Sequence, residues 1–293
     1  MNISVIVPVK NDQRIQRCLE ALTRQKFDGE YEIIVVENDI TRPLKDAIEQ
    51  FPVKYLCEPH GGSYNARNSG ISLAQYNILA FTDSDCIVDE NWLQSLAFGF
   101  SSEKCGGVCG RNVNLPEEGN LVVMSQRNIA SDGGPQYLPQ IFHAPFAPTC
   151  NVAYRRSVIN RLNGFDEEFK SGGDVDIAWR MNILGYTLVY APDAIVHFGC
   201  RNTLSGYFRQ FYNYGMGHTL LFKKYKRITG RKLILNAWSR KLIFHSIANL
   251  FWRFITLQNK EVIMPYMLEL LEGLGLLTGG IVGSFKNHVI YTT

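Results

Sequence analysis

Residues 3–39 read ISVIVPVKNDQRIQRCLEALTRQKFDGEYEIIVVEND, a stretch with two apolar runs separated by a more polar segment. The runs at 3–9 and 31–37 are rich in Ile and Val, which is typical of buried β-strands. Between them, residues 12–26 place Ile15, Leu19 and Leu22 at helical spacing. The stretch therefore predicts a strand, a helix and a second strand, the unit from which parallel sheets are built.

The same alternation continues along the next part of the chain. We expect, in order, a short helix at 43–51, a strand at 53–56, a turn at 61–63, a helix at 64–74 and a strand at 77–81. These segments predict an α/β fold with a mainly parallel sheet flanked by helices. In such sheets ligands bind beyond the carboxyl ends of the strands. Glu37, Asp83 and Asp85 fall at those ends.

The overall composition excludes several classes of protein. With 46% hydrophobic and 19% charged residues over 293 positions, the chain is globular rather than disordered, collagen-like or a disulfide scaffold. Seven scattered Cys residues indicate a reducing compartment, so we expect a cytoplasmic protein. We expect no signal peptide, because no basic region precedes an apolar stretch at the start. No uncharged apolar run reaches the roughly 18 residues of a spanning helix.

Charge is distributed unevenly along the chain. The net charge is +3, yet residues 194–260 contain twelve Lys or Arg and no Asp or Glu. Residues 1–193 therefore carry a net charge of −7, since residues 261–293 contribute −2. We expect a first domain at 1–200 and a basic helical extension at 201–293, with breaks at 215–217, 229–230 and Pro265. The basic extension predicts an anionic partner.

Aromatic residues accompany the basic charge of this extension. Eight Lys or Arg lie within 223–241, and Trp238, Phe244, Phe251, Trp252 and Phe254 lie among or after them. Basic and aromatic residues together on helices are typical of peripheral binding to an anionic membrane surface. Alternatively, the aromatic side chains pack onto the first domain and the charges form a solvated face. We expect no nucleic acid as partner, because no recognised nucleic-acid-binding fold accompanies the charge.

Two groups of carboxylates are candidates for metal binding or catalysis. Asp83 and Asp85 follow a buried strand, where both could hold one divalent ion, or one could hold the ion and the other a ribose hydroxyl. Asp174 lies at the start of a helix, with Asp176 in its first turn, so Asp174 is either a functional carboxylate or an N-cap. His197 ends a strand and is either structural or a further metal ligand.

Two further segments, one rich in Pro and one containing two Cys, are interpreted from their composition and spacing. Residues 131–148 contain four Pro and predict a long loop over the site, either an acceptor-binding segment or a lid. Cys105 and Cys109 could form a metal pair, but no second Cys or His pair with suitable spacing lies nearby, so we interpret them as structural.

Seven segments occur in one order along residues 1–200: VIVPVKND, EIIVVEND, GGSYNARNSGISLA, ILAFTDSDC, NVAYRRSVINRLNGFDEEF, GGDVDIAWR and PDAIVHF. In this order they closely resemble glycosyltransferase family 2, the inverting nucleotide-sugar transferases with a GT-A fold. The resemblance implies a nucleotide-sugar donor, with UDP as the commonest nucleotide, and a divalent metal ion, Mn²⁺ or Mg²⁺. It also implies a Rossmann-like GT-A domain, here followed by the helical extension.

The resemblance implies roles for the residues that would hold the nucleotide base. Pro8 and Val9 would line the base pocket. Glu37 stands where the family has an acidic residue that contacts the base. Because Glu37-Asn38-Asp39 replaces the commoner run of Asp residues, Asn38 or Asp39 is the alternative contact.

The resemblance also assigns residues to the rest of the donor and to the metal. Arg67 matches the family Arg near the base and diphosphate. Asp83 matches the carboxylate that binds ribose, with Ser84 beside it in the donor site, and Asp85 matches the metal ligand. His197 resembles the His that adds a metal ligand in a subset of the family.

Asp174 matches the family's catalytic base, with Asp176 and Arg180 as supporting residues. These roles imply an inverting transfer of a sugar to a hydroxyl of a lipid-linked or polysaccharide acceptor, at the cytoplasmic face of a membrane. The alternatives are a soluble transferase acting on a protein, peptide or small molecule, a nucleotidyltransferase, and a non-catalytic sugar-binding or partner-binding module on the same fold.

Overall fold

The computed structural model describes residues 1–115, 119–126, 134–235 and 238–292. The chain forms two compact units. The first, here called the sheet unit, comprises Met1–Val113, Ser131–Tyr137 and Ala144–Gly199. The second, here called the helical unit, comprises Asn114–Ala130, Leu138–His143 and Cys200–Thr293.

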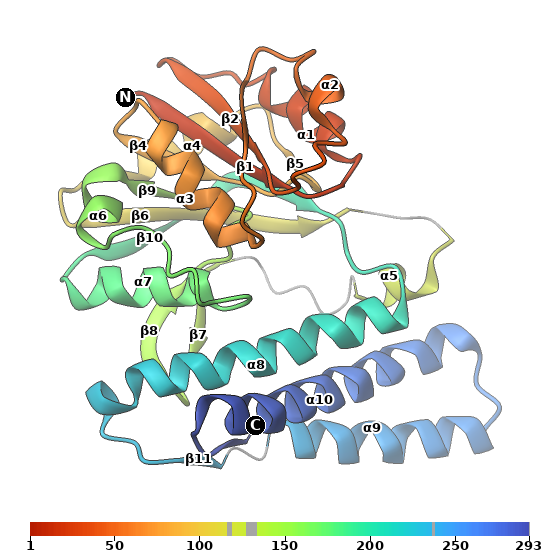
Figure 1. Ribbon diagram of the computed structural model, residues 1–293. Coiled ribbons are helices and arrows are strands. Elements are labelled where there is room, and N and C mark those ends of the chain that lie inside the picture. Colours follow the sequence, from red (N-terminus) through yellow and green to blue (C-terminus); the bar gives the residue numbers. More distant parts are fainter. Residues whose placement is uncertain (116–118, 127–133, 236–237, 293) are drawn as a thin grey trace. The chain divides into compact units, whose positions relative to one another are not determined.

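The sheet unit is built on an eight-stranded sheet with the order β3-β2-β1-β4-β9-β6-β10-β5 (Figure 1). Its strands are β1 (Ile3–Val9), β2 (Tyr31–Glu37), β3 (Lys54–Cys57), β4 (Ile78–Phe81), β5 (Cys86–Val88), β6 (Cys105–Asn114), β9 (Val152–Arg155) and β10 (Thr187–Phe198). The pairs β3–β2, β2–β1 and β1–β4 are parallel, whereas β4–β9, β9–β6 and β10–β5 are antiparallel. The strand–helix alternation of the sequence thus corresponds to the parallel strands.

Six helices belong to this unit: α1 (Ile15–Leu22), α2 (Lys45–Ile48), α3 (Ser63–Leu73), α4 (Trp92–Gly99), α6 (Arg156–Arg161) and α7 (Gly173–Ile183). The first helix is shorter than expected from residues 12–26. The Asp12 carboxylate accepts a hydrogen bond from the backbone N–H of Arg14 at 3.0 Å, which forms a turn ahead of the helix.

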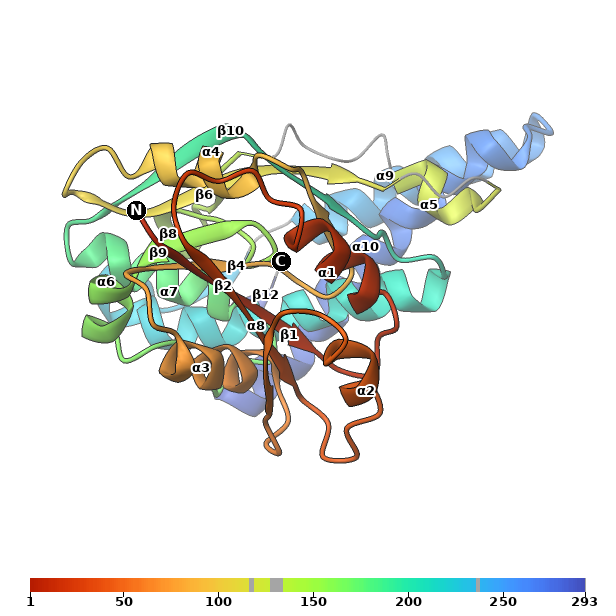
Figure 2. The ribbon, with the colours of Figure 1, turned by 90° about the horizontal axis from the view of Figure 1, so that it is seen from above.

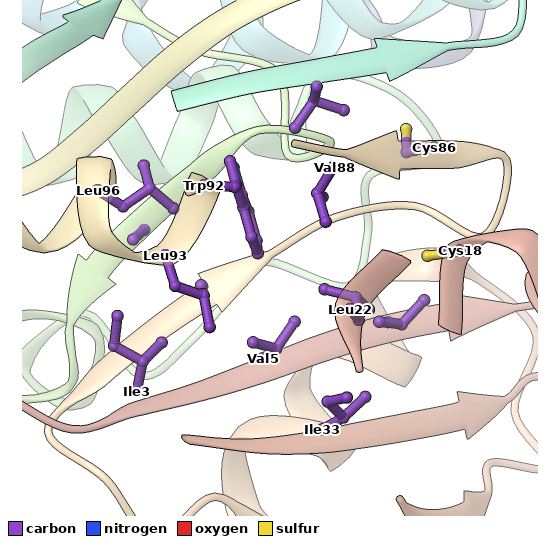
Figure 3. Packing of buried hydrophobic residues seen from close by; sticks show 14 of the residues in the cluster. Ile3, Val5, Cys18, Leu22, Ile33, Cys86, Val88, Trp92, Leu93 and Leu96 are labelled. Atoms are coloured by element: carbon purple, nitrogen blue, oxygen red, sulfur yellow. The ribbon is translucent and has the colours of Figure 1, made fainter. Parts of the chain in front are cut away.

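Residues of β1 alternate between the two faces of the sheet. Helix α3 packs along β1 and β2 on one of these faces (Figure 2). On one face Val5 belongs to a buried cluster with Leu22 of α1 and with Trp92 and Leu93 of α4 (Figure 3). On the other face Ile6 lies against α3, so close that a Cβ atom at Gly70 would lie 2.6 Å from its Cγ2 atom. Each fully buried side chain of this kind stabilises the fold by about 1.5–3 kcal/mol.

The parallel register brings several strand ends to one edge of the sheet. Val9 at the end of β1 is paired with Glu37 at the end of β2. Phe81 ends β4 and is paired with Ile6 of β1, so residues 82–85 leave the sheet at this same edge. The acidic residues predicted at strand ends therefore lie at the carboxyl edge of the parallel strands.

Residues 131–148 were expected to be a long loop, and that prediction is wrong for 136–138 and 142–146. The strands β7 (Gln136–Leu138) and β8 (Phe142–Phe146) form a two-stranded sheet, while 131–133 lie outside the described residues. In β8 the side chains of Ala144 and Phe146 are buried and His143 is exposed, an alternation that stabilises a strand despite the Pro content. Cys105 and Cys109 are buried in β6, in agreement with a structural role.

The helical unit contains α5 (Leu121–Gln126), α8 (Leu204–Thr229), α9 (Trp238–Ile255) and α10 (Lys260–Asn287), with the short strands β11 (Ile234–Leu235) and β12 (Tyr291–Thr292). Within it, α10 packs against both α8 and α9 (Figure 1). The predicted break at 229–230 is confirmed, since Gly230 caps α8 in the left-handed conformation with φ 68°.

Two predicted helix breaks are wrong. Helix α8 runs through 215–217 without interruption, because Gly215 allows the backbone of α10 to approach closely. A Cβ atom there would lie 2.5 Å from the carbonyl oxygen of Leu276. Helix α10 likewise continues through Pro265 in its second turn, where proline removes one backbone hydrogen bond.

By length and composition alone, α10 could cross a membrane, although no such segment was expected from the sequence. It has a window of mean hydropathy 1.3, of which 39% is buried within the protein. The buried core helix of a soluble protein meets the same criteria, so this finding is weak evidence for a membrane span.

Candidate functional site

Arg67 of α3 and Asp83, which follows β4, form an ion pair at the carboxyl edge of the sheet. The Arg67 Nη2 atom lies 2.5 Å from Asp83 Oδ1. Arg67 is 3% exposed, whereas the Asp83 side chain is 36% exposed and accessible to a ligand. The backbone N–H of Cys86 donates to the Asp83 carbonyl at 3.1 Å, so 83–86 form a turn. Arg67 thus fixes the orientation of an accessible carboxylate.

Asp85, the second acidic residue of this turn, faces a different cation. The Arg14 Nη2 atom lies 3.4 Å from Asp85 Oδ2 and 2.8 Å from Asp12 Oδ2. Ser84 is buried, and its hydroxyl donates to Asp12 at 3.4 Å. Burial acts to raise the pKa of Asp12, but hydrogen bonds from Arg14 outweigh it and the pKa lies below the ordinary value. Asp12 therefore stays ionised and anchors Arg14 beside Asp85.

The donor set around Asp85 suits one kind of metal site. Among the described residues there is no group of three or more His, Cys, Asp or Glu that could hold a metal ion. Mg²⁺ is usually bound by one or two carboxylates together with substrate phosphates, not by a cage made of protein alone. Asp85 supplies one carboxylate of this kind, with the Arg14 guanidinium as a charged neighbour. His197 has its Nε2 atom 3.0 Å from Asp89 Oδ1, so its ring is engaged with Asp89.

Asp174 lies in the first turn of α7, and Gly172 rather than Asp174 is the N-cap, with φ 90°. The Asp174 Oδ1 atom accepts hydrogen bonds from the Val175 N–H at 3.0 Å and from the Tyr64 hydroxyl at 3.4 Å. The same hydroxyl oxygen accepts from the N–H of Gly173 at 3.0 Å. Burial raises the pKa of Asp174 above its ordinary value. The half-buried carboxylate is therefore oriented by its own helix and by Tyr64 of α3.

Helix α3 links the two carboxylates of the site. Tyr64 and Arg67 lie three residues apart, and the guanidinium carbon of Arg67 lies 5.5 Å from the centroid of the Tyr64 ring. Electrostatic attraction to Arg67 lowers the pKa of Asp174 and repulsion from Asp83 raises it, although burial has the larger effect. Asp83, Arg67, Tyr64 and Asp174 therefore form one connected site, with two carboxylates positioned by neighbouring side chains.

The residues at the end of β2 are mostly engaged within the sheet unit. Glu37 is fully buried and accepts hydrogen bonds from the Leu44 N–H at 2.9 Å and the Tyr55 hydroxyl at 2.6 Å. Burial and the hydrogen bond to Glu37 raise the pKa of Tyr55. One oxygen of Glu37 thus holds the segment that follows β2, and the other holds Tyr55 of β3. The structure does not place this carboxylate at the surface of the site.

Asn38 is also internal, whereas Asp39 is accessible. The Asn38 amide donates to the carbonyl of His60 at 2.6 Å and accepts from the Gly62 N–H at 2.8 Å. Asp39 is only half-buried, and hydrogen bonds from the backbone and hydroxyl of Thr41 lower its pKa. Of the three acidic or amide residues predicted at this strand end, Asp39 offers the most accessible carboxylate.

Four other predicted site residues are buried or half-buried. Pro8 and Val9 are buried at the end of β1, and the Val9 side chain is part of the hydrophobic core. Asp176 is fully buried and accepts from Arg180 Nε at 2.7 Å. Arg180 also donates to the carbonyl of Leu162 at 2.6 Å, so this pair connects α7 to the segment before it. Asp176 and Arg180 therefore support the position of α7.

Sequence reasoning missed Tyr64, Asp12 and Arg14 as parts of the site. The spacing of Tyr64 and Arg67 at i and i+3 on a helix could have indicated that they share a face. Asp12 and Arg14 directly follow the first strand, whose carboxyl end was already expected to border the site. No signal in the sequence pairs Arg14 with Asp85.

Comparisons with known proteins identify the family and the fold of this chain. The profile of Glycosyl transferase family 2 matches residues 4–162. The glycosyltransferase AglE of Haloferax volcanii is 34% identical over 210 residues, covering 68% of this chain and 66% of AglE. The O-antigen chain rhamnosyltransferase RfbN of Salmonella typhimurium is 25% identical over 232 residues, covering 74% of this chain and 73% of RfbN. The chain therefore spans just under two thirds of the length of AglE.

A solved structure extends the likeness to the whole fold. The mannosyltransferase PcManGT of Pyrobaculum calidifontis, in complex with GDP-Man and Mn²⁺, superposes with a TM-score of 0.66 at 16% identity. The superposition covers 97% of this chain and 87% of that one. At this identity the likeness concerns the fold. The α/β GT-A fold with C-terminal helices, expected from the sequence, is confirmed.

Proposed function

This chain belongs to glycosyl transferase family 2 and is a glycosyltransferase, and on that premise we propose that it moves a sugar from a nucleoside-diphosphate sugar to an acceptor hydroxyl with inversion. The donor class is supported by the GDP-Man bound to PcManGT. We further propose a glycan or lipid-linked acceptor, which is supported by the similarity to RfbN, an O-antigen chain rhamnosyltransferase.

The observation that carries this proposal is the position of Asp174 beside the Arg67–Asp83 pair. In the proposed reaction the Asp174 carboxylate accepts the proton of the acceptor hydroxyl while that oxygen attacks the anomeric carbon. The bond from the anomeric carbon to the diphosphate breaks on the opposite face, so the configuration inverts. A base of raised pKa suits this role, because its proton affinity is closer to that required near neutral pH.

The neighbouring residues supply orientation and charge. The Asp83 carboxylate, whose side chain is 36% exposed, can accept a hydrogen bond from a ribose hydroxyl. Arg67 fixes that carboxylate in place. Arg14 has a half-exposed guanidinium group beside Asp85, which provides positive charge for a diphosphate. A Mn²⁺ or Mg²⁺ ion held by Asp85 would neutralise the negative charge that develops on the departing nucleoside diphosphate.

The proposal is tested first by equilibrium binding. UDP-sugars and GDP-sugars are titrated into the protein by calorimetry, with Mn²⁺, with Mg²⁺, or with EDTA. We expect one donor to bind with metal present, and Asp85→Ala to weaken that binding while the matched variant Asp46→Asn, on the exposed side of α2, leaves it unchanged. Donor binding that is indifferent to EDTA and to Asp85→Ala would contradict the metal role.

The stereochemical part needs the product. NMR of the anomeric proton in the transferred sugar is expected to show the configuration opposite to that of the donor. Retention of configuration would exclude Asp174 as the base of a single displacement. Candidate acceptors are compared in the same assay, and transfer only to a peptide or small molecule would favour that acceptor class over a glycan or lipid-linked one.

A further inference from the structure

Helix α9 exposes large apolar side chains along most of its length. Phe244, Phe251, Trp252 and Phe254 are 74%, 69%, 67% and 77% exposed, respectively. Together with Ile247 and Ile255 they form what is here called the α9 apolar face. Helix α9 itself lies at the outer edge of the helical unit, against α10 (Figure 1). The members at 244, 247, 251 and 254 recur at helical spacing. A contiguous exposed patch of this kind marks an interaction surface.

The opposite side of α9 determines which way this face points. Ser239 and Ser246 are fully buried, and the Ser246 hydroxyl donates to the Glu269 carboxylate of α10 at 3.3 Å. Arg253 packs over the ring of Tyr266 in α10 at 4.5 Å and donates to its hydroxyl at 2.7 Å. Because these contacts attach the polar side of α9 to α10, the apolar face is held outward.

The charges around this face indicate the kind of partner. Arg240 and Lys241 are exposed in the first turn of α9, and α9 contains no Asp or Glu. The absence of acidic residues extends from 194 to 260, a range with twelve Lys or Arg. A second copy of the chain would bring the same positive charge to the interface. An anionic phospholipid surface instead offers negative headgroups to the basic residues and acyl chains to the aromatic side chains.

The packing of α10 favours a helix that lies in the surface over one that spans it. A Cβ atom at Gly279 would lie 2.1 Å from the carbonyl oxygen of Tyr212, so α10 and α8 pack backbone against backbone. Helix α8 ends with a basic run that includes Lys226 and Arg227 and is too polar to enter a bilayer with α10. Among the described residues, α9 presents seven exposed large apolar side chains and α10 presents three, so α9 offers the larger surface for lipid.

We propose that the α9 apolar face binds an anionic phospholipid surface as an in-plane interfacial helix, with Phe251 and Trp252 inserted below the headgroups and Arg240 and Lys241 beside the phosphates. This goes beyond the proposed sugar transfer and is independent of it. Lipid binding is measured without any nucleotide sugar, so its failure leaves the proposed reaction untouched.

Co-sedimentation of the whole chain with vesicles tests the proposal. The vesicles are phosphatidylcholine alone or phosphatidylcholine mixed with phosphatidylglycerol. The protein is expected to bind the mixed vesicles, and the double variant Phe251→Ser/Trp252→Ser to lose about tenfold or more in affinity. The matched control is Phe98→Ser, which removes a Phe that is 73% exposed on α4 and should leave binding unchanged.

Variants that remove basic charge, and the fluorescence of the exposed Trp residues, provide two further tests. Arg240→Gln/Lys241→Gln is expected to reduce affinity for the mixed vesicles about fivefold per charge removed. Trp92 and Trp179 are fully buried, so a blue shift of fluorescence on vesicle addition reports on exposed Trp252 and Trp238 of α9. Bound protein should be released by alkaline carbonate, as expected for a helix that lies in the interface.

Several results would overturn the proposal. One is the absence of binding to mixed vesicles by a folded protein, and another is binding that the double variant retains. Resistance to carbonate would indicate a spanning segment instead. Self-association in analytical ultracentrifugation that the same double variant abolishes would identify a second copy of the chain as the occupant of the α9 apolar face.

Discussion

Replacing Tyr64 with phenylalanine removes one hydroxyl group and keeps the ring that packs on Phe165, whose centroid lies 5.6 Å away. Tyr64 is 6% exposed, and its hydroxyl oxygen accepts hydrogen bonds from the N–H groups of Gly173 at 3.0 Å and Asp174 at 3.3 Å. It also donates to Asp174 Oδ1 at 3.4 Å. The change therefore removes the hydrogen bonds between α3 and the first turn of α7 and leaves the ring packed there.

The magnitude follows from the donors left without a partner. A buried N–H that loses its acceptor costs about 1–3 kcal/mol, so Tyr64→Phe should lower the free energy of unfolding by that amount. For a chain of this size the melting temperature should fall by roughly 2–4 °C per kcal/mol. Asp174 also loses one of the groups that orient it, and a misplaced catalytic group costs up to about 100-fold in rate. We expect kcat to fall and KM for the donor to change little.

The assay is thermal denaturation together with steady-state kinetics on the same preparations. The matched control is Tyr76→Phe, which removes a hydroxyl group that makes an exposed 3.4 Å hydrogen bond to Glu30. Surface changes of this kind usually stay within about 0.5 kcal/mol. If Tyr64→Phe matched both the wild type and this control in melting temperature and in kcat, Tyr64 would not position Asp174.

Three further predictions concern other parts of the structure. Because burial raises the folded-state pKa of Asp174 above its unfolded value, stability falls as pH rises from the unfolded pKa to the raised folded pKa. In melting curves across pH, Asp174→Asn should therefore match the wild type below the unfolded pKa and melt increasingly higher as pH rises through the raised pKa. Glu37→Ala leaves the Leu44 N–H and the Tyr55 hydroxyl without their acceptor, so the free energy of unfolding in urea should fall by at least about 1–3 kcal/mol. An increase in KM for the donor without loss of stability would instead indicate that Glu37 contacts the donor. Gly279→Ala forces a methyl group against the Tyr212 carbonyl and should lower the free energy of unfolding by about 1–3 kcal/mol. The control Gly61→Ala, with no atom within 4 Å of the added carbon, should not be destabilised, and equal melting temperatures of the two variants would contradict the close packing of α8 and α10.

The parallel strands could be predicted from the sequence because their apolar runs are long and are bounded by polar segments. Their order along the chain also indicated that Asp83 and Asp85 would lie at the carboxyl edge of the sheet. The approach of Asp174 to that edge was less accessible to sequence reasoning, because it depends on α7 packing against α3 through Tyr64. No local pattern encodes a contact between residues more than a hundred positions apart.

The helical unit shows where local propensity fails. Glycine at 215–217 and Pro265 predicted breaks, yet both helices continue because tertiary packing outweighs intrinsic preference. Gly215 stabilises the packing of α8 on α10, since a larger residue could not lie against the α10 backbone. Glu37 is a similar case at the strand end, because its partner Tyr55 belongs to a neighbouring strand whose register the sequence does not specify.

Release of nucleoside diphosphate from a panel of nucleotide sugars, followed with acceptor and with Mn²⁺ or Mg²⁺ present, tests the central claim most directly. Wild type, Asp174→Asn and the exposed control Asp46→Asn are compared at one pH. We expect turnover of one donor, a decrease of about 10²–10⁴-fold in Asp174→Asn, and no change in the control. Equal rates in all three proteins, or no turnover of any donor by the folded wild type, would contradict it.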